Sequence, residues 1–160
     1  MIIWATQPVI RSETMERSLK LADLFDDYEM ILPTALKEKP YAPLLRDDRG
    51  RVCSSRETHL ESAPCPEFGE SNIGLFLLKS EAMFNALLEL KSRYWNQAEQ
   101  CYQRPGGELG FPNELINYFA EGEKGVFACP IADSREEQGI KTLEDVASCE
   151  RFISALAQQS

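Results

Sequence analysis

The sequence predicts an α/β domain in which a mostly parallel sheet is covered by helices on both faces. Short apolar runs that suit buried strands alternate along the chain with segments whose apolar residues recur at helical spacing. Proline and glycine fall between these segments and mark their ends. Because 160 residues is the usual size of one domain, we expect a single domain over residues 1–160.

The first half of the chain is expected to contain a strand, a helix, a second strand and a hairpin. Residues 2–5 form an apolar run typical of a buried strand, and Pro8 ends it. The helix is expected to begin at Ser12, whose hydroxyl can cap it. Residues 30–32 read as the next strand. The two extended segments of the hairpin are residues 41–46 and 51–57.

The second half continues the alternation of strands and helices. In order, we expect an exposed loop at 61–67, a central strand at 73–78, a helix from Ser80, a loop at 102–111, a helix with Pro112 in its first turn, and a strand at 126–129. Thr142, with Asp145 three residues later, is expected to cap the last helix.

The predicted ends of strands carry polar residues or turn residues. Pro8, Asn72 and Asp133 each come just after a predicted strand or at its edge. Ligands of wound α/β sheets bind beyond the carboxyl ends of strands. We therefore expect these residues around one crevice.

Composition excludes several classes of function. A net charge of −9 repels phosphate backbones, which argues against a nucleic-acid partner. No apolar run is long enough for a bilayer helix, and the start of the chain does not resemble an export signal, so we expect no membrane partner and a cytoplasmic location. The cysteines are scattered and His59 is the only histidine, which makes a zinc site improbable and favours reduced thiols.

The stretch of residues 69–78 is the most informative part of the chain. It places Glu70, Asn72 and Gly74 at the mouth of an apolar strand. The two polar side chains can bind sugar hydroxyls, and Gly74 would let a bulky group approach the backbone. The alternative is a turn followed by a core strand, with the polar residues merely ending it.

Several further motifs accompany this stretch in a fixed order. They are the hairpin at residues 41–52, Glu57, Asn72-Ile73-Gly74, Gly107-Glu108 with Asn113, and residues 136–146. This order resembles the later part of sugar-phosphate nucleotidyltransferases, the group that contains the molybdenum-cofactor guanylyltransferase-like enzymes and the N-acetylglucosamine-1-phosphate uridylyltransferases. The resemblance covers nearly the whole chain.

The resemblance implies a nucleotide-diphospho-sugar transferase fold of Rossmann-like type, here without the N-terminal unit that carries the family's glycine-rich loop. It implies transfer of a nucleotidyl group from a nucleoside triphosphate to a sugar phosphate or similar acceptor, with release of pyrophosphate and with Mg²⁺ as cofactor. The family's N-terminal half would be a further partner, and the chain alone is expected to be inactive. The alternatives are a non-catalytic sugar-nucleotide binding or partner module, and a fragment that needs its other half to fold.

The resemblance also implies roles for individual residues. Glu57 and Asn72 match positions that contact the sugar, and Glu70, Tyr41 and Glu108 are assigned to substrate binding with them. Glu57 could instead be a solvated strand end, and Glu108 could support a loop. No residue is assigned to catalysis.

The positions implied for the metal are altered in this chain. Thr6 stands where the family has an aspartate, and Lys141 stands where it has an asparagine. Asp133 is the remaining candidate for a metal ligand, although residues 133–137 also fit a solvated face with Asp133 or Glu136 pointing inward. A lysine does not coordinate a hard cation, but it can bind phosphate as a point charge.

Overall fold

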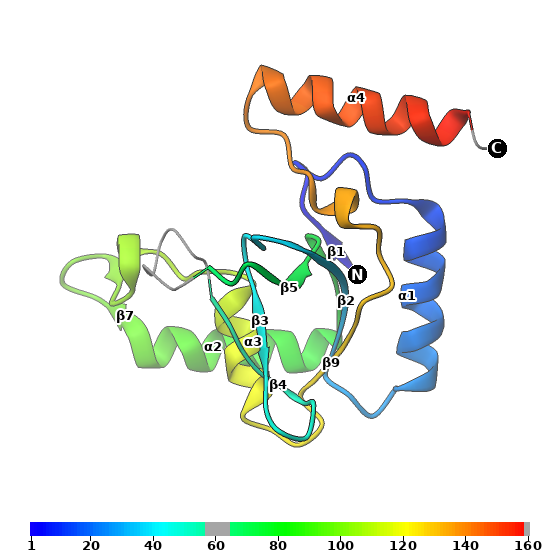
Figure 1. Cartoon of the computed structure of the whole chain (residues 1–160). Helices are drawn as coiled ribbons and strands as arrows, with labels where there is room; N and C mark the ends of the chain where they lie inside the picture. The colour runs from blue at the N-terminus through cyan, green and yellow to red at the C-terminus, as the bar shows by residue number, and fades with distance from the viewer. Residues whose placement is uncertain (57–64, 159–160) are drawn as a thin grey trace.

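A mixed sheet lies at the centre of the protein, whose computed structural model describes residues 1–56 and 65–158 (Figure 1). Its strands are β1 (Ile2–Ile3), β6 (Leu75–Leu78), β2 (Met30–Glu38) and β5 (Phe68–Asn72) in that order, with β9 (Val126–Cys129) also paired to β2. The pairs β1–β6, β6–β2 and β2–β5 are antiparallel, whereas β9 runs parallel to β2. The α/β class is confirmed, and the prediction of a mostly parallel sheet is wrong.

The direction of β5 and β6 explains this correction. Since β6 is antiparallel to both of its neighbours, β1 runs in the same direction as β2, and β9 does so too. Helices precede β2 and β9, as expected for crossovers between strands of one direction. β5 and β6 follow each other across a break of two residues and come after the hairpin of β3 (Leu44–Arg46) and β4 (Val52–Ser55).

Helices cover both faces of the sheet, as predicted. Successive residues of β2 point to opposite faces. Met30 and Leu32 pack with residues of α2 (Ser80–Tyr94) and α3 (Asn113–Ala120), while Ile31 and Ala35 pack toward α1 (Ser12–Leu24). Both clusters are buried and apolar, so the sheet is a central layer between two hydrophobic cores.

β2 is longer than the sequence predicts because it changes partners along its length. Met30 and Ile31 pair with β6, and the segment from Thr34 to Glu38 pairs with β5. Pro33, which has no N–H to donate, lies at the change of partner and is fully buried. The strand therefore continues past Pro33.

The helix ends agree with the sequence in one case and differ in others. Thr142 and Asp145 form the predicted capping box of α4 (Leu143–Ala157). Ser12 and Ser80 do not cap, since α1 and α2 begin at these residues and the caps are the preceding residues. The remaining short elements are β7 (Trp95–Asn96), β8 (Cys101–Tyr102) and the 3₁₀ turns η1 (Pro105–Gly107) and η2 (Ser134–Glu137).

The last helix lies apart from the sheet, at the top of Figure 1. Its buried residues Cys149 and Phe152 pack against Val9, in the loop that leads to α1.

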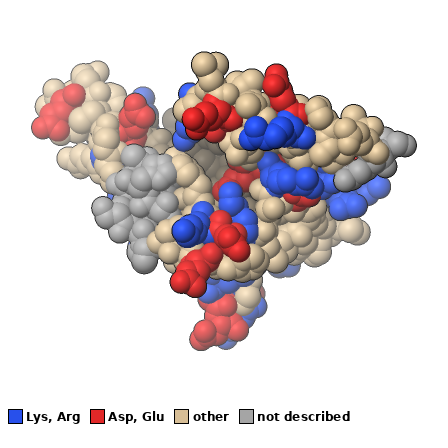
Figure 2. Space-filling view, turned by 45° about the horizontal axis from the view of Figure 1, so that its top comes forward, with Lys and Arg blue, Asp and Glu red and all other residues tan. Residues whose placement is uncertain are grey.

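Among the helices in the described part of the chain, none is long and apolar enough to cross a membrane. On the face seen in Figure 2, basic and acidic side chains are interspersed and do not form one basic patch.

Candidate functional site

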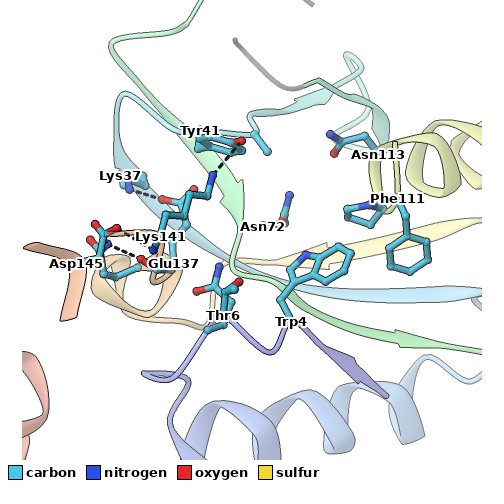
Figure 3. A pocket seen from close by; sticks show the side chains of 15 residues that line it. Trp4, Thr6, Lys37, Tyr41, Asn72, Phe111, Asn113, Glu137, Lys141 and Asp145 are labelled. Atoms are coloured by element: carbon cyan, nitrogen blue, oxygen red, sulfur yellow. Dashed lines mark hydrogen bonds and ion pairs between the residues drawn. The ribbon is translucent and has the colours of Figure 1, made fainter. Parts of the chain in front are cut away.

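A cavity of about 420 Å³ lies where β5 ends, between the loop after β1 and the segment before α4. Aromatic side chains form one side of it, and charged side chains form the opposite side (Figure 3). Asn72 points into it from between the two sides. Its volume suits a ligand of small-molecule size.

Trp4 and Phe111 form the aromatic side. Their rings meet edge to face with centroids 5.5 Å apart, and the Trp4 ring also meets Phe76 of the core at 6.2 Å. The Trp4 backbone N–H donates to the Gly74 carbonyl at 3.0 Å. Gly74 has a φ of +78°, and a Cβ there would lie 2.8 Å from Trp4 Cδ1 and 2.7 Å from Gln7 Cγ. The bulky groups that approach Gly74 are therefore side chains of the protein itself.

Two buried amides face the cavity. Asn72 is 9% exposed, and its side-chain carbonyl accepts from the Gly74 N–H at 3.2 Å. Asn113, at the start of α3, is 5% exposed and accepts from the Ser55 hydroxyl at 2.7 Å. These bonds fix both side chains at the wall of the cavity.

Lysines and acids form the charged side. The Lys141 ammonium lies 3.5 Å from the Tyr41 hydroxyl oxygen and 4.7 Å from the centre of its ring. Lys37 forms an ion pair with Glu137, whose carboxylate also accepts from the Ser71 hydroxyl. The Glu137 side chain is only 9% exposed. Its charge is therefore balanced within the wall.

Glu136, the residue before Glu137, fixes the backbone on the charged side of the cavity. Glu136 is fully buried, and it accepts from the Arg11 backbone N–H, the Arg11 Nε and the Thr14 hydroxyl, each at 2.9 Å. It also accepts from the Asp133 N–H, which closes a capping box on η2. Further on, the Ile140 N–H donates to the Thr6 carbonyl at 2.8 Å. These bonds join the wall to α1 and to the loop after β1.

Asp145 lines the cavity but directs its carboxylate to the backbone. It accepts from the N–H groups of Lys141 and Thr142 at 2.9 and 2.8 Å, and from the Gln138 amide at 3.1 Å. The bonds from Lys141 and Thr142 hold the pKa of Asp145 below its ordinary value. The carboxylate is therefore ionised and occupied in capping α4.

The structure brings together five of the residues singled out from the sequence, which are Thr6, Tyr41, Asn72, Asn113 and Lys141. They come from separate segments of the chain and line the same cavity. The predicted crevice of Pro8, Asn72 and Asp133 is wrong in part, because only Asn72 lies at the cavity. Strand β5 ends at Asn72, whereas the loops after β1 and β9 carry Pro8 and Asp133 away from it.

The other predicted site residues lie elsewhere. Glu70 is ion-paired with Arg46 at 2.7 Å and does not line the cavity, and Glu108 is exposed outside it. Asp133 caps η2 and pairs with Arg135, whose hydrogen bond lowers the pKa of Asp133 to about 2. Glu57 and its predicted sugar contact lie outside the described residues.

Sequence reasoning missed Trp4, Lys37 and Glu137 as cavity residues. The period-two pattern of β2 could have placed Lys37 on one face of its strand, but it does not show what covers that face. Glu137 follows the buried Glu136, and nothing in the sequence distinguishes the two acids. Trp4 read as part of a buried strand, although β1 ends at Ile3.

The donor set of this cavity does not fit the Mg²⁺ ion that the resemblance implies. Mg²⁺ requires oxygen ligands in octahedral geometry, usually with one or two carboxylates. Thr6 offers a neutral hydroxyl, Lys141 brings an ammonium, and the acids Glu137 and Asp145 are already bound to Lys37 and to backbone N–H groups. Within residues 1–56 and 65–158, no three His, Cys, Asp or Glu side chains are grouped for a metal ion.

No protein-family model matches this chain, and no curated protein matches it either.

Proposed function

We propose that this chain is a nucleotidyltransferase-like domain whose cavity binds a phosphorylated sugar or a similar small acceptor. One observation carries the proposal. Tyr41, Asn72, Asn113 and Lys141 lie far apart in the sequence, at positions where the resemblance to the nucleotidyltransferases rests, and they line the same cavity. A set of motifs without a common ligand would have no reason to meet there.

The chemistry of the wall suits such a ligand. Amide and hydroxyl groups from Asn72, Asn113 and Tyr41 can exchange hydrogen bonds with sugar hydroxyls. The Trp4 ring offers an apolar surface beside them, as is common in small-molecule sites. The Lys141 ammonium can receive an anionic group. A phosphorylated sugar presents all of these features within one small molecule.

In the reaction of the nucleotidyltransferases, a phosphate oxygen of the acceptor attacks the α-phosphorus of a nucleoside triphosphate. The bond from the α-phosphorus to the bridging oxygen breaks, and pyrophosphate leaves with the electron pair. The residues of this cavity would bind and orient the acceptor for that attack, which is a large part of catalysis in phosphoryl-type transfers.

Calorimetric titration with glucose 1-phosphate, N-acetylglucosamine 1-phosphate and the corresponding nucleoside-diphosphate sugars tests the proposal. We expect saturable binding with one ligand per chain, and an Asn72→Ala variant should bind about tenfold more weakly because it loses a buried hydrogen bond to the ligand. Asn85→Ala, on the exposed surface of α2, is the matched control. Thermal unfolding of both variants checks that they are folded. Absence of binding to every one of these ligands would exclude the proposal.

A second candidate, a non-catalytic sugar-nucleotide binding module, is favoured by the poor fit of the cavity to a metal ion. A coupled assay for pyrophosphate release separates the two. It would contain each nucleoside triphosphate with the sugar phosphate that binds best, in a magnesium buffer, with and without an added N-terminal unit that carries the family's glycine-rich loop. Ligand binding with turnover favours the transferase, and ligand binding without turnover under all these conditions favours the binding module.

A further inference from the structure

We infer that Lys141 supplies the positive charge for the anionic group of the ligand, so that a phosphorylated sugar binds this cavity without a divalent metal ion. This inference rests on the proposed function and makes it more specific. It concerns how the phosphate is held, whereas the proposed function concerns which kind of molecule enters the cavity.

The Lys141 ammonium contacts an aromatic side chain and no carboxylate among the described residues. It lies against Tyr41, 3.5 Å from the hydroxyl oxygen and 4.7 Å from the ring centre. A cation–π contact orients an ammonium without neutralising its charge. Within the described residues, no carboxylate lies within ion-pair distance of the Lys141 Nζ. The ammonium is therefore oriented and still able to pair with an anion.

The two acids of the cavity already have hydrogen-bond or ion-pair partners other than Lys141. Glu137 is ion-paired with Lys37 and accepts from the Ser71 hydroxyl. Asp145 accepts from backbone N–H groups at the start of α4, which also keep its pKa low. Neither acid is ion-paired with Lys141, so among the described cations of the cavity Lys141 is the one whose ammonium has no carboxylate partner.

A divalent cation finds few oxygen ligands at the two positions where the resemblance implies metal binding, which Thr6 and Lys141 occupy here. A lysine ammonium has donors only, so it cannot act as a ligand for the metal. Thr6 adds only a neutral oxygen to this part of the wall. The arrangement therefore favours direct contact between the ammonium and the phosphate.

The backbone around Lys141 supports this role. The Ile140 N–H donates to the Thr6 carbonyl at 2.8 Å, and the Lys141 N–H donates to Asp145 at 2.9 Å. The backbone of Lys141 and of the residue before it is thus tied to neighbouring segments. The backbone is fixed in this way, and the flexible side chain lets the ammonium adjust to the phosphate.

Calorimetry of the full chain with glucose 1-phosphate tests the inference, in buffer with Mg²⁺ and in buffer with a metal chelator. We expect the same dissociation constant, within about twofold, under both conditions. Unphosphorylated glucose and inorganic phosphate are separate titrations that distinguish the contributions of the sugar and of the anion. Both should bind more weakly than glucose 1-phosphate.

The Lys141→Met variant removes the ammonium and keeps the length of the side chain. We expect its affinity for glucose 1-phosphate to fall by about tenfold to a hundredfold, the usual effect of losing a charge-assisted hydrogen bond, and its affinity for glucose to stay unchanged. Lys20→Met, on the exposed surface of α1, is the matched control and should bind as the wild type does. Thermal unfolding confirms that each variant is folded.

A double variant, Thr6→Asp with Lys141→Asn, tests the exclusion of metal directly. It replaces the hydroxyl and the ammonium by oxygen ligands that suit Mg²⁺. We expect binding of glucose 1-phosphate to this variant to become dependent on Mg²⁺.

The possible outcomes separate this inference from the proposed function. Wild-type binding that disappears with the chelator, or equal binding by wild type and Lys141→Met, would overturn the role of Lys141 and leave the sugar-phosphate site intact. No binding of any phosphorylated sugar with or without Mg²⁺ would overturn both. Metal-independent binding that Lys141→Met weakens supports the inference.

Discussion

Replacing Gly74 by alanine should destabilise the protein through two effects that can be measured separately. The residue has a φ of +78°, where an L-residue with a Cβ is strained by about 1 kcal/mol. The new Cβ would also lie 2.7 Å from Gln7 Cγ and 2.8 Å from Trp4 Cδ1, so both side chains must move. Overpacking of this kind costs about 1–3 kcal/mol. We expect a total loss of about 2–4 kcal/mol.

Two other glycines provide the controls for this experiment. Gly50 has a φ of +77°, and a Cβ added there would meet no atom within 4 Å, so Gly50→Ala should report the backbone strain alone. Gly110 has an equally open position without a positive φ, so Gly110→Ala should be nearly neutral. The difference between the Gly74 and Gly50 variants then measures the cost of displacing Trp4 and Gln7.

Urea unfolding followed by circular dichroism gives the free energy of unfolding for the wild type and the three variants. With a slope of about 2 kcal/mol per molar urea, the Gly74→Ala midpoint should fall by about 1–2 M. Equal losses for Gly74→Ala and Gly50→Ala, within about 0.5 kcal/mol, would refute the close packing of the aromatic wall against this glycine.

Three further predictions concern titratable groups. Glu136→Gln should lower the free energy of unfolding by about 3 kcal/mol in urea titrations, because Arg11 loses its buried carboxylate partner, and a loss below about 1 kcal/mol would contradict this. Since the pKa of Asp133 is lowered to about 2, its pairing with Arg135 stabilises the fold above the unfolded value of about 4 and is lost as pH falls toward about 2. Asp133→Asn should therefore cost about 1 kcal/mol or less at neutral pH, with a difference from wild type that shrinks over that range and does not grow. Burial raises the pKa of the Cys149 thiol, so alkylation followed by mass spectrometry should modify it only after unfolding, and rapid modification of the folded chain would disprove its burial.

Helix α2 could be predicted from the sequence because its apolar residues recur at helical spacing and face the core. Leu90 is buried there, and Met83, Leu87 and Tyr94 pack against the core cluster. Strand direction is different, because it depends on how strands are connected and paired. The apolar runs of β2 and β6 indicate buried strands, but such a run looks the same in a parallel and in an antiparallel pair. The pattern therefore does not show that β5 and β6 pair antiparallel to β2.

Asn72 could be singled out from the sequence because it lies at the edge of an apolar run, and Lys141 because the resemblance places it at an altered metal position. Glu70 shows the limit of this reasoning. It lies two residues before Asn72, but its carboxylate accepts from Thr34 and Arg46, and Arg46 arrives from a hairpin elsewhere in the chain. Partners that come from distant segments decide whether a polar side chain faces a ligand or the protein. A single sequence does not contain that information in any local pattern.

Neighbouring acids in the wall of the cavity show how this decision is made. Glu136 turns toward α1 and takes the guanidinium of Arg11, whereas Glu137 turns the other way and takes the ammonium of Lys37. Among the described residues on this side, Lys141 is the cation without a carboxylate partner, and it contacts Tyr41, so it is available to the phosphate group that we propose. If Glu137 lost Lys37, its carboxylate would be left to compete for Lys141 with the anionic ligand that we propose, so the Lys37–Glu137 ion pair supports the role of the lysine.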